Sequence, residues 1–201
     1  MEIPMMLELL FATNNMNKVK EAELVLSRFG IALKAVAIDK IEIQSSSLRE
    51  IAIYAAKSAF RVAKRPIIVE DSGLFIDALN GFPGPYSNYV YKTIGLKGIL
   101  KLLDGVTDRR ARFTAVVALA VGEGDVYVFE GSIEGYISSE IRGGSGFGFD
   151  PIFIPVGCSK TFGEMDIAEK TIYSHRGKAF RELGIWILNN RDKALIQSKA
   201  L

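Results

Sequence analysis

Apolar residues in this sequence fall into short runs and alternating stretches that are typical of β-strands. Residues 7–12 (LELLFA) form a short, mostly apolar run, and residues 33–43 alternate between apolar and polar positions. Residues 109–121 and 126–137 alternate as well, and the Gly-Glu-Gly-Asp turn at 122–125 separates them. Alternation with a period of two places every second side chain on one face, so we expect strands here, the last two as a long hairpin.

Other segments have the spacing of helices. Apolar side chains recur on one side of residues 19–29. Ser47 and Glu50 form a capping-box pattern that predicts a helix from Ser47 to about Lys64. Residues 86–104 predict two short helices broken near Gly95.

The last periodic segment, residues 179–190, predicts a terminal helix. Ser174 is a candidate N-cap for it. We expect four of its apolar side chains to face inward, namely Phe180, Leu183, Ile187 and Leu188.

The stretch from Pro66 to Ser87 joins an apolar run to two adjacent carboxylates. We expect a buried strand at residues 67–69 that stops at Glu70-Asp71, after which Ser72-Gly73 turns the chain away and residues 81–85 (GFPGP) form a stiff loop. In α/β proteins, ligands bind where strands end. Neighbours on a strand face opposite ways, so one carboxylate can face a cleft while the other supports it. The alternative is a strand end with two solvated acids.

A polar loop, TNNMNK, follows the first expected strand at residues 13–18. Threonine and asparagine side chains, a lysine and the N–H groups of a helix N-terminus are the parts of an anion site. The loop lacks the glycines of a Walker motif, and an ordinary N-cap explains the loop better when it is taken alone.

A glycine-rich loop, GGSGFGFDP, occupies residues 143–151 and leads into a short expected strand at 152–155. Four glycines within six residues indicate unusual backbone torsions or close approach to another group. Two aromatic residues and Asp150 within the loop argue against a flexible linker. A cationic cluster of Lys170, His175 and Arg176 follows.

Composition limits the classes that the protein can belong to. The 201 residues are 49% hydrophobic and 24% charged, with a net charge of +2. We therefore expect one domain over residues 1–201 and no nonspecific nucleic-acid binding. The single cysteine, Cys158, fits a reducing compartment, and no run approaches the roughly 20 apolar residues of a membrane span. With an N-terminus too short and acidic for a signal peptide, we expect a cytoplasmic protein.

These groups together favour attack by water on a nucleoside triphosphate. The single histidine, His175, argues against a His-rich metal site, so the expected metal is Mg²⁺ on carboxylates at Glu42 and at residues 70–71. Lysines and helix N–H groups suit phosphate oxygens. An aromatic in a glycine loop suits one face of a base, and an arginine can cover the other.

Four motifs, in order, resemble the inosine triphosphate pyrophosphatase family: TNNMNK at 13–18, EDSGL with GFPGPYS at 70–87, GFGFDPIF at 146–153 and EKTIYSHRGKA at 169–179. The resemblance implies an elongated, two-lobed α/β fold around a long mixed β-sheet with flanking helices and an active cleft between the lobes. It implies hydrolysis of ITP, dITP and XTP to the monophosphate and pyrophosphate. It further implies a Mg²⁺-dependent homodimer, with Mn²⁺ as a possible substitute.

The resemblance also implies a role for each matching residue. Asp71 is the general base, and Glu42 with Asp71 holds Mg²⁺. The residues expected to bind substrate are Thr13, Asn14, Asn15, Met16, Asn17 and Lys18 at the phosphates with Lys57 nearby, Ser72, Phe147, Gly148, Phe149 and Asp150 at the base, and Lys170, His175 and Arg176 closing the site. Asn14 stands where many members carry Gly or Ser, and Lys57 also reads as a solvated helix lysine.

Two other functions compete with this one. A nucleotide pyrophosphatase of the septum-inhibition type shares the architecture and acts on other modified nucleotides or pyrimidines, but the GFGFDP and SHR motifs argue against it. A non-catalytic nucleotide- or RNA-binding module needs a basic face. The cluster Arg109, Arg110 and Arg112 fits a solvated strand edge better.

Overall fold

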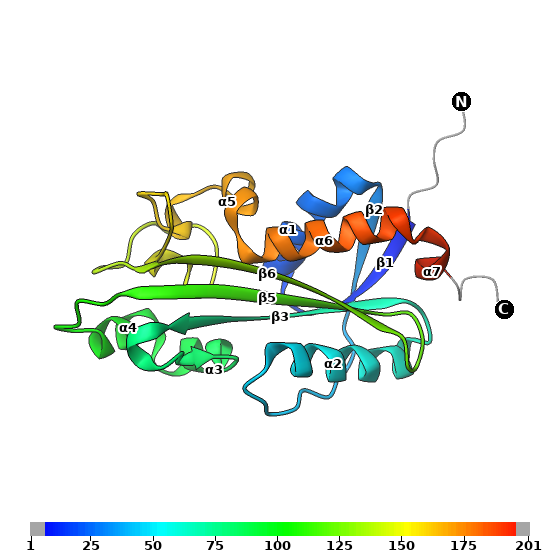
Figure 1. Ribbon diagram of the computed structural model, residues 1–201, viewed down its shortest axis with the longest axis horizontal. Coiled ribbons are helices and arrows are strands. Elements are labelled where there is room, and N and C mark those ends of the chain that lie inside the picture. The colour runs from blue at the N-terminus through cyan, green and yellow to red at the C-terminus, as the bar shows by residue number, and fades with distance from the viewer. Residues whose placement is uncertain (1–6, 196–201) are drawn as a thin grey trace.

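The computed structural model describes residues 7 to 195, which form a long twisted sheet with helices on both faces (Figure 1). The strand order is β2-β1-β3-β5-β6-β7, with β4 paired to β3. β1 runs parallel to β2 and β3, and the remaining pairs are antiparallel. The strands are β1 (Leu7–Ala12), β2 (Ile31–Val36), β3 (Ile67–Ile76), β4 (Pro83–Gly84), β5 (Arg110–Ala120), β6 (Val126–Ile137) and β7 (Phe153–Pro155). The fold is therefore the elongated mixed α/β architecture that the resemblance implied.

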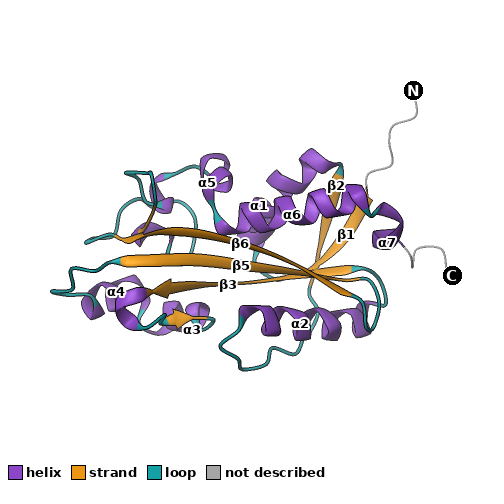
Figure 2. Cartoon of the chain, in the orientation of Figure 1, coloured by secondary structure: helices purple, strands orange, loops and turns teal. Residues whose placement is uncertain are grey.

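The helices cover the two faces of this sheet, α1, α5 and α6 on one and α2, α3 and α4 on the other (Figure 2). Their bounds are α1 (Met16–Leu26), α2 (Leu48–Ala63), α3 (Ser87–Thr93), α4 (Gly95–Leu102), α5 (Ile167–Tyr173), α6 (His175–Asn189) and α7 (Arg191–Leu195). Within residues 7–195, no helix is both long and apolar enough to cross a bilayer.

The core divides into three apolar clusters. One lies under α1 and α6, where Phe11 meets Phe180 edge-on with ring centroids 5.8 Å apart. The second lies under α2, where the small side chains of Ala52 and Ala56 allow helix and sheet to approach closely. The third surrounds Phe113 at the other end of the sheet. Two clusters thus stabilise one lobe and the third stabilises the other.

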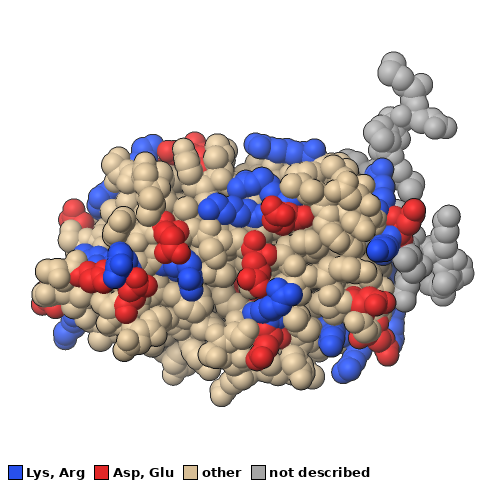
Figure 3. Space-filling model, viewed as in Figure 1, with Lys and Arg blue, Asp and Glu red and all other residues tan. Residues whose placement is uncertain are grey.

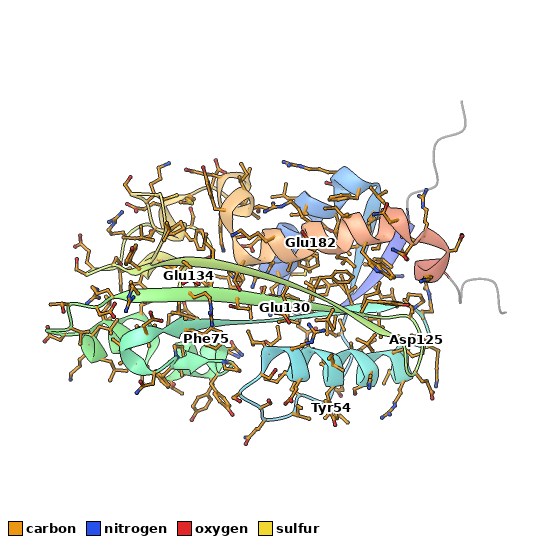
Figure 4. The ribbon with its side chains drawn as sticks, viewed as in Figure 1. Tyr54, Phe75, Asp125, Glu130, Glu134 and Glu182 are labelled. Atoms are coloured by element: carbon orange, nitrogen blue, oxygen red, sulfur yellow. The ribbon has the colours of Figure 1, made fainter. Side chains whose placement is uncertain are left out.

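An exposed ion pair also joins two layers at the surface. Glu130 of β6, labelled in Figure 4, accepts from Arg49 of α2 at 2.9 Å. Both side chains are about half exposed, so solvent screens the pair and it contributes little to stability. Burial in the three clusters therefore dominates the stability of the fold.

The predicted hairpin and the paired short helices are confirmed. β5 and β6 pair from Arg110 opposite Tyr136 to Ala120 opposite Val126. The helix break falls at Gly95, whose positive φ of 63° suits glycine.

The expectation that a strand stops at Glu70 was wrong. β3 continues through Ser72 and Gly73 to Ile76, because β5 pairs with it along this whole length. Gly73 serves close approach instead of a turn: a Cβ there would collide with the carbonyl oxygen of Gly84, in β4. Glu70 and Asp71 therefore lie inside a central strand.

The second strand was also predicted too long. β2 ends at Val36, because its neighbour β1 ends at the paired residue Ala12 and no other strand pairs with β2 in the described part of the chain. Glu42 consequently lies in an irregular segment before α2, not at a strand end.

The terminal helix begins earlier than expected, at His175, and Ser174 caps it by accepting from the N–H of Gly177 at 3.0 Å. Leu188 is 56% exposed, so its expected inward orientation was wrong. Ile187 takes the inward position, and the next residue of a helix turns about 100° away from it. The single-domain reading of residues 1–201 stays a prediction. So does the reading of the N-terminus, whose first six residues lie outside the described residues.

Candidate active site

A cavity of about 1050 Å³ opens between the two lobes. Its walls come from the start of α1, the middle of β3, residues 36–44, the start of α3 and the glycine-rich loop. The predicted site residues that line it are Thr13, Asn14, Asn15, Met16, Asn17, Lys18, Glu42, Asp71, Ser72, Phe147, Gly148, Phe149, Asp150, His175 and Arg176. The fold thus brings together residues that are up to 163 positions apart in the sequence.

The polar loop connects β1 to α1 and caps the helix. The side-chain oxygen of Asn15 accepts from the N–H groups of Asn17 and Lys18, at 3.0 and 3.3 Å. The Thr13 hydroxyl accepts from the N–H of Asn15 at 3.1 Å. The N-cap reading is therefore confirmed. The anion site stays a prediction, which the helix start on the cavity wall supports because its dipole favours an anion.

Lys18 ties this loop to β3. Its Nζ lies 2.8 Å from Oε2 of Glu70 and donates to the Glu70 backbone carbonyl at 3.2 Å. Burial alone would raise the pKa of Glu70, but the charges of Arg176 and Lys18 outweigh it and lower the pKa to about 2. Glu70 is therefore an ionised, buried anchor for two cations.

Asp71, the next residue along β3, has a different environment. It is half-buried on the cavity wall, and its Oδ1 accepts from the N–H of Ser72 at 3.0 Å. Burial raises the pKa of Asp71 to about 6, and the nearby charges of Glu70 and Glu42 add to this against the opposing charge of Lys18. A carboxylate with a pKa in this range can accept a proton near neutral pH.

Glu42 faces the same cavity from the irregular segment before α2. Its side chain is 64% exposed and forms an ion pair with Lys40. Within residues 7–195, no group of three His, Cys, Asp or Glu side chains could hold a metal ion by itself. The charge of Glu42 raises the pKa of Asp71, and two carboxylates on one cavity fit a hard cation that takes its remaining ligands from water and phosphate, as Mg²⁺ does.

The glycine-rich loop forms one wall of the cavity. Oδ2 of Asp150 accepts from the N–H of Phe147 at 2.7 Å, which closes the loop into a tight turn. Gly146 has a φ of 75°, and a Cβ there would strike the Asp150 carboxylate. Phe149 is buried and meets Tyr91 of α3 edge-on, with ring centroids 5.5 Å apart. The turn leaves Phe147 on the cavity surface.

Arg176 lies at the start of α6, and all three of its donor groups are bonded. Nε donates to Glu70 at 3.1 Å, Nη1 to Glu21 at 2.7 Å and Nη2 to Ser72 at 2.9 Å. Its Cζ lies 5.1 Å from the centroid of the Phe147 ring. Hydrogen bonds to residues of β3 and α1 therefore hold the edges of the guanidinium, and Phe147 lies close to it.

Lys170, expected to close the site, lies below the wall instead of on its surface. The side chain is 2% exposed, and its Nζ donates to Glu21 and to Asp150, both at 2.6 Å. The same Nζ lies 4.9 Å from the Phe147 ring. Direct contact of Lys170 with substrate stays a prediction, whereas its contacts with Phe147 and Asp150 of the glycine-rich loop are present in the structure.

Sequence reasoning missed Glu21, a buried carboxylate that bonds both Arg176 and Lys170. Burial raises the pKa of Glu21, but Arg176 and Lys170 outweigh that effect and lower it. A signal did exist in the sequence. Glu21 stands four residues before Val25, on the inward stripe of α1, where an acid requires a partner.

His175 is buried between aromatic rings. Its imidazole stacks on Phe113, with ring centroids 4.6 Å apart and planes inclined by 8°. Burial and the charges of Arg176 and Lys170 lower the pKa of His175 well below its usual range. Its Nδ1 is buried and has no hydrogen-bond partner among the described residues. The imidazole is therefore neutral.

Lys57 does not line the cavity, so its place near the phosphates stays a prediction. The sequence also gave no functional reading of the start of α3. In and just before this helix, Tyr86, Asn88, Tyr89, Tyr91 and Lys92 line the cavity, and Tyr91 packs against Phe149 of the glycine-rich loop.

Comparison with known proteins gives consistent results. The model of the Ham1 family matches residues 9–186 of this chain. A dITP/XTP pyrophosphatase of Hyperthermus butylicus is 52% identical over 179 residues, which cover 89% of this chain and 94% of that protein. A dITP/XTP pyrophosphatase of Methanopyrus kandleri is 50% identical over 184 residues, covering 92% and 98% of the two chains.

Solved structures agree with the sequence matches. A HAM1 protein from Coxiella burnetii superposes with a TM-score of 0.81 at 32% identity, covering 92% of this chain and all of that one. The Staphylococcus aureus Ham1 protein superposes with a TM-score of 0.77 at 29% identity, covering 90% of this chain and 98% of that one.

Proposed function

Because the chain belongs to the Ham1 family, we propose that it hydrolyses non-canonical purine nucleoside triphosphates to the nucleoside monophosphate and pyrophosphate. The observation that carries this proposal is the single cavity in which Asp71 lies between an N-capped helix start and the Phe147 wall. The helix start suits the phosphates and the aromatic wall suits the base. The substrates are ITP, dITP and XTP, whose removal keeps them out of the nucleotide pool.

Asp71 acts as the general base in this reaction. It takes a proton from a water molecule, the water oxygen bonds to the α-phosphorus, and the bond between that phosphorus and the bridging oxygen to the β-phosphate breaks. Pyrophosphate leaves with the electron pair of that bond. The pKa of about 6 supports this role, because the carboxylate is ionised at neutral pH yet still basic. Lys18 and the helix start stabilise the charge on the phosphates.

Glu42 and Asp71 would hold Mg²⁺, or Mn²⁺ in its place. When bound, such an ion neutralises phosphate charge and orients the triphosphate. Both carboxylates line the cavity and the charge of Glu42 raises the pKa of Asp71, which supports this assignment, since a cation there relieves their repulsion.

His175 accounts for the preference for an oxygen at position 6 of the purine. A neutral imidazole carries one proton. Nδ1 is buried and has no partner, whereas Nε2 is not among the buried unpaired atoms and His175 lines the cavity, so we assign the proton to Nε2, where a ligand can accept it. Nε2–H can then donate to the 6-oxygen of hypoxanthine or xanthine, whereas the 6-amino group of adenine offers it no acceptor. Asp150 accepts from the ring N–H beside that oxygen.

We place the enzyme in the cytoplasm as a homodimer that binds neither nucleic acid nor membrane. The single Cys158 suits a reducing compartment. Figure 3 shows acidic and basic side chains interspersed on the face in view, which gives no basic stripe for nucleic acid there. Light scattering at several protein concentrations tests the dimer.

A panel of nucleotides with product identification tests the function. We expect kcat/KM for ITP, dITP and XTP to exceed that for ATP by orders of magnitude, because adenine leaves buried polar groups unpaired. GTP and the pyrimidine triphosphates complete the panel. Release of orthophosphate with a diphosphate product, or equal cleavage of ATP and ITP, would contradict the proposal.

A further inference from the structure

The region behind the Phe147 wall contains a carboxylate that the proposed reaction does not use. Glu21 is 3% exposed and does not line the cavity. Its Oε1 lies 2.6 Å from Nζ of Lys170 and its Oε2 lies 2.7 Å from Nη1 of Arg176. One carboxylate therefore links α1 to the two cations beside Phe147, which come from α5 and α6.

We propose that Glu21 is a positioning residue for purine binding. It holds the Arg176 guanidinium and the Lys170 ammonium in fixed places against the Phe147 ring, so that the base meets a preformed wall. This inference rests on the proposed function, because it assumes that the Phe147 wall receives the purine.

The bonds of Arg176 explain the first half of this role. A guanidinium carries its donors in one plane, so partners on different edges fix both its position and its tilt. Glu70, Ser72 and Glu21 take three different nitrogens. Glu70 and Ser72 both come from β3, so Glu21 alone braces the guanidinium from the side of α1. Without it, the plane can rotate about the remaining bonds.

The second half concerns Lys170. A lysine side chain is flexible and its ammonium is strongly hydrated, so burial at 2% exposure requires carboxylate partners. Asp150 is one partner and also closes the turn that presents Phe147. Glu21 is the other. Without the Glu21 charge, the Lys170 ammonium and the Arg176 guanidinium lose the carboxylate that they share. Both cations can then shift and displace Phe147 and the turn that presents it.

The length and charge of the side chain both matter in this arrangement. Glutamine offers one oxygen and one NH₂, so it can satisfy one cation while its NH₂ faces the other. Aspartate keeps the charge but is one methylene shorter, so it cannot reach both nitrogens. Each change removes at least one charge-assisted hydrogen bond.

The test compares Glu21→Gln with Glu23→Gln, a matched change on the exposed side of the same helix. Because the wall binds substrate and transition state alike, we expect Glu21→Gln to raise KM for ITP by about 10-fold or more and to change kcat by less than about 3-fold. Glu23→Gln should leave both constants within about 2-fold of wild type. A KM for Glu21→Gln within 2-fold of the control overturns the proposal.

A double-mutant cycle with Phe147→Ala separates positioning from general loosening of the fold. If Glu21 acts through the wall, Glu21→Gln should cost much less, about 2-fold in KM, once Phe147 is gone. An equal KM increase in both backgrounds would show that Glu21 merely supports the fold, and would overturn the proposal.

If Glu21→Gln does not fold, Glu21→Asp decides the question. We expect it to melt near the wild-type temperature and to raise KM by several fold. A wild-type KM in a folded Glu21→Asp enzyme overturns the proposal. Failure of the proposed function is distinguished by the wild-type enzyme itself, which would then release orthophosphate instead of pyrophosphate or would cleave ATP as efficiently as ITP.

Discussion

Glu70 and Asp71 are adjacent acids on one strand, yet their surroundings give them different chemistry. Glu70 bonds Lys18 and Arg176, and its pKa falls to about 2. Asp71 lies on the cavity wall, where burial raises its pKa to about 6. A difference of this size between neighbours comes from the placement of the cations and not from the residue type. The difference supports the proposal that Asp71 transfers the proton while Glu70 serves the structure.

Asp71→Asn should therefore remain folded but lose nearly all activity. Asparagine keeps the shape of the side chain and cannot accept a proton, and positioned bases contribute roughly 10²–10⁴-fold. Circular dichroism checks the fold, and pyrophosphate release from ITP checks activity. Retention of more than about a tenth of wild-type kcat would exclude Asp71 as the base.

Glu70→Gln should act mainly on stability. The folded pKa of Glu70 is about 2 against an ordinary value of 4.5, so its ionised form stabilises the fold above pH 4.5. That contribution is lost as the pH falls from 4.5 toward 2, since the carboxylate then protonates in the folded state as well. The shift corresponds to roughly 3 kcal/mol at neutral pH.

Urea unfolding of wild type and Glu70→Gln at pH 7, 4.5 and 3 measures this. The wild type should be more stable than the variant at pH 7, and the gap should shrink toward pH 3. A gap that stays constant across these pH values would show that the Glu70 charge does not stabilise the fold.

At the scale of elements, the close packing of β3 against β4 fixes the position of the strand that carries Asp71. Ser72 and Gly73 continue β3 beside β5, and the backbone of Gly84 passes directly over Gly73. The glycine is required because no side chain fits between the two strands. Residues 70–72, which face the cavity, depend on this packing for their position.

Gly73→Ala should consequently lower the free energy of unfolding by roughly 1–3 kcal/mol, as overpacking of a core does, and should also reduce kcat. Gly144→Ala is the control, because a Cβ there meets open space. Urea unfolding and ITP hydrolysis measure the two effects. Equal stability of the two variants would contradict this account of Gly73.

At the scale of the whole molecule, the site exists only because two lobes meet. The polar loop and Glu42 belong to the lobe around α1 and α2, whereas the Phe147 wall and α3 belong to the other end of the sheet. A nucleoside triphosphate has a polyanionic end and an aromatic end. The cavity offers a matching surface to each, the polar loop to the phosphates and the Phe147 wall to the base. Glu42 and Asp71 line the same cavity.

Removal of the proposed metal ion should affect how the cavity binds the triphosphate. Activity should vanish in excess chelator and return on addition of Mg²⁺ or Mn²⁺, because the proposed ligands are carboxylate oxygens. The melting temperature of the nucleotide-free protein should change little, since its core is apolar. Full activity in excess chelator would exclude the metal role of Glu42 and Asp71.

The sequence by itself determined the elements whose signals are local. The β5–β6 hairpin follows from alternation around a turn, and α2 and α6 follow from the caps Ser47 and Ser174. Such features depend on residues a few positions apart, so periodicity and capping suffice to predict them. The motifs that line the cavity were likewise readable, because each is a compact run of unusual residues.

Only the tertiary structure decided the rest. β3 extends past Gly73 because β5, forty residues later, supplies its hydrogen bonds, and β2 ends at Val36 because β1 ends beside it. Glu21 is tied to the cavity wall through Lys170 and Arg176, which lie 149 and 155 residues away in the sequence. Burial and ion pairing of this kind depend on which distant residues share a small volume. No local pattern encodes that, because the energy of a buried charge is set by its neighbours in space.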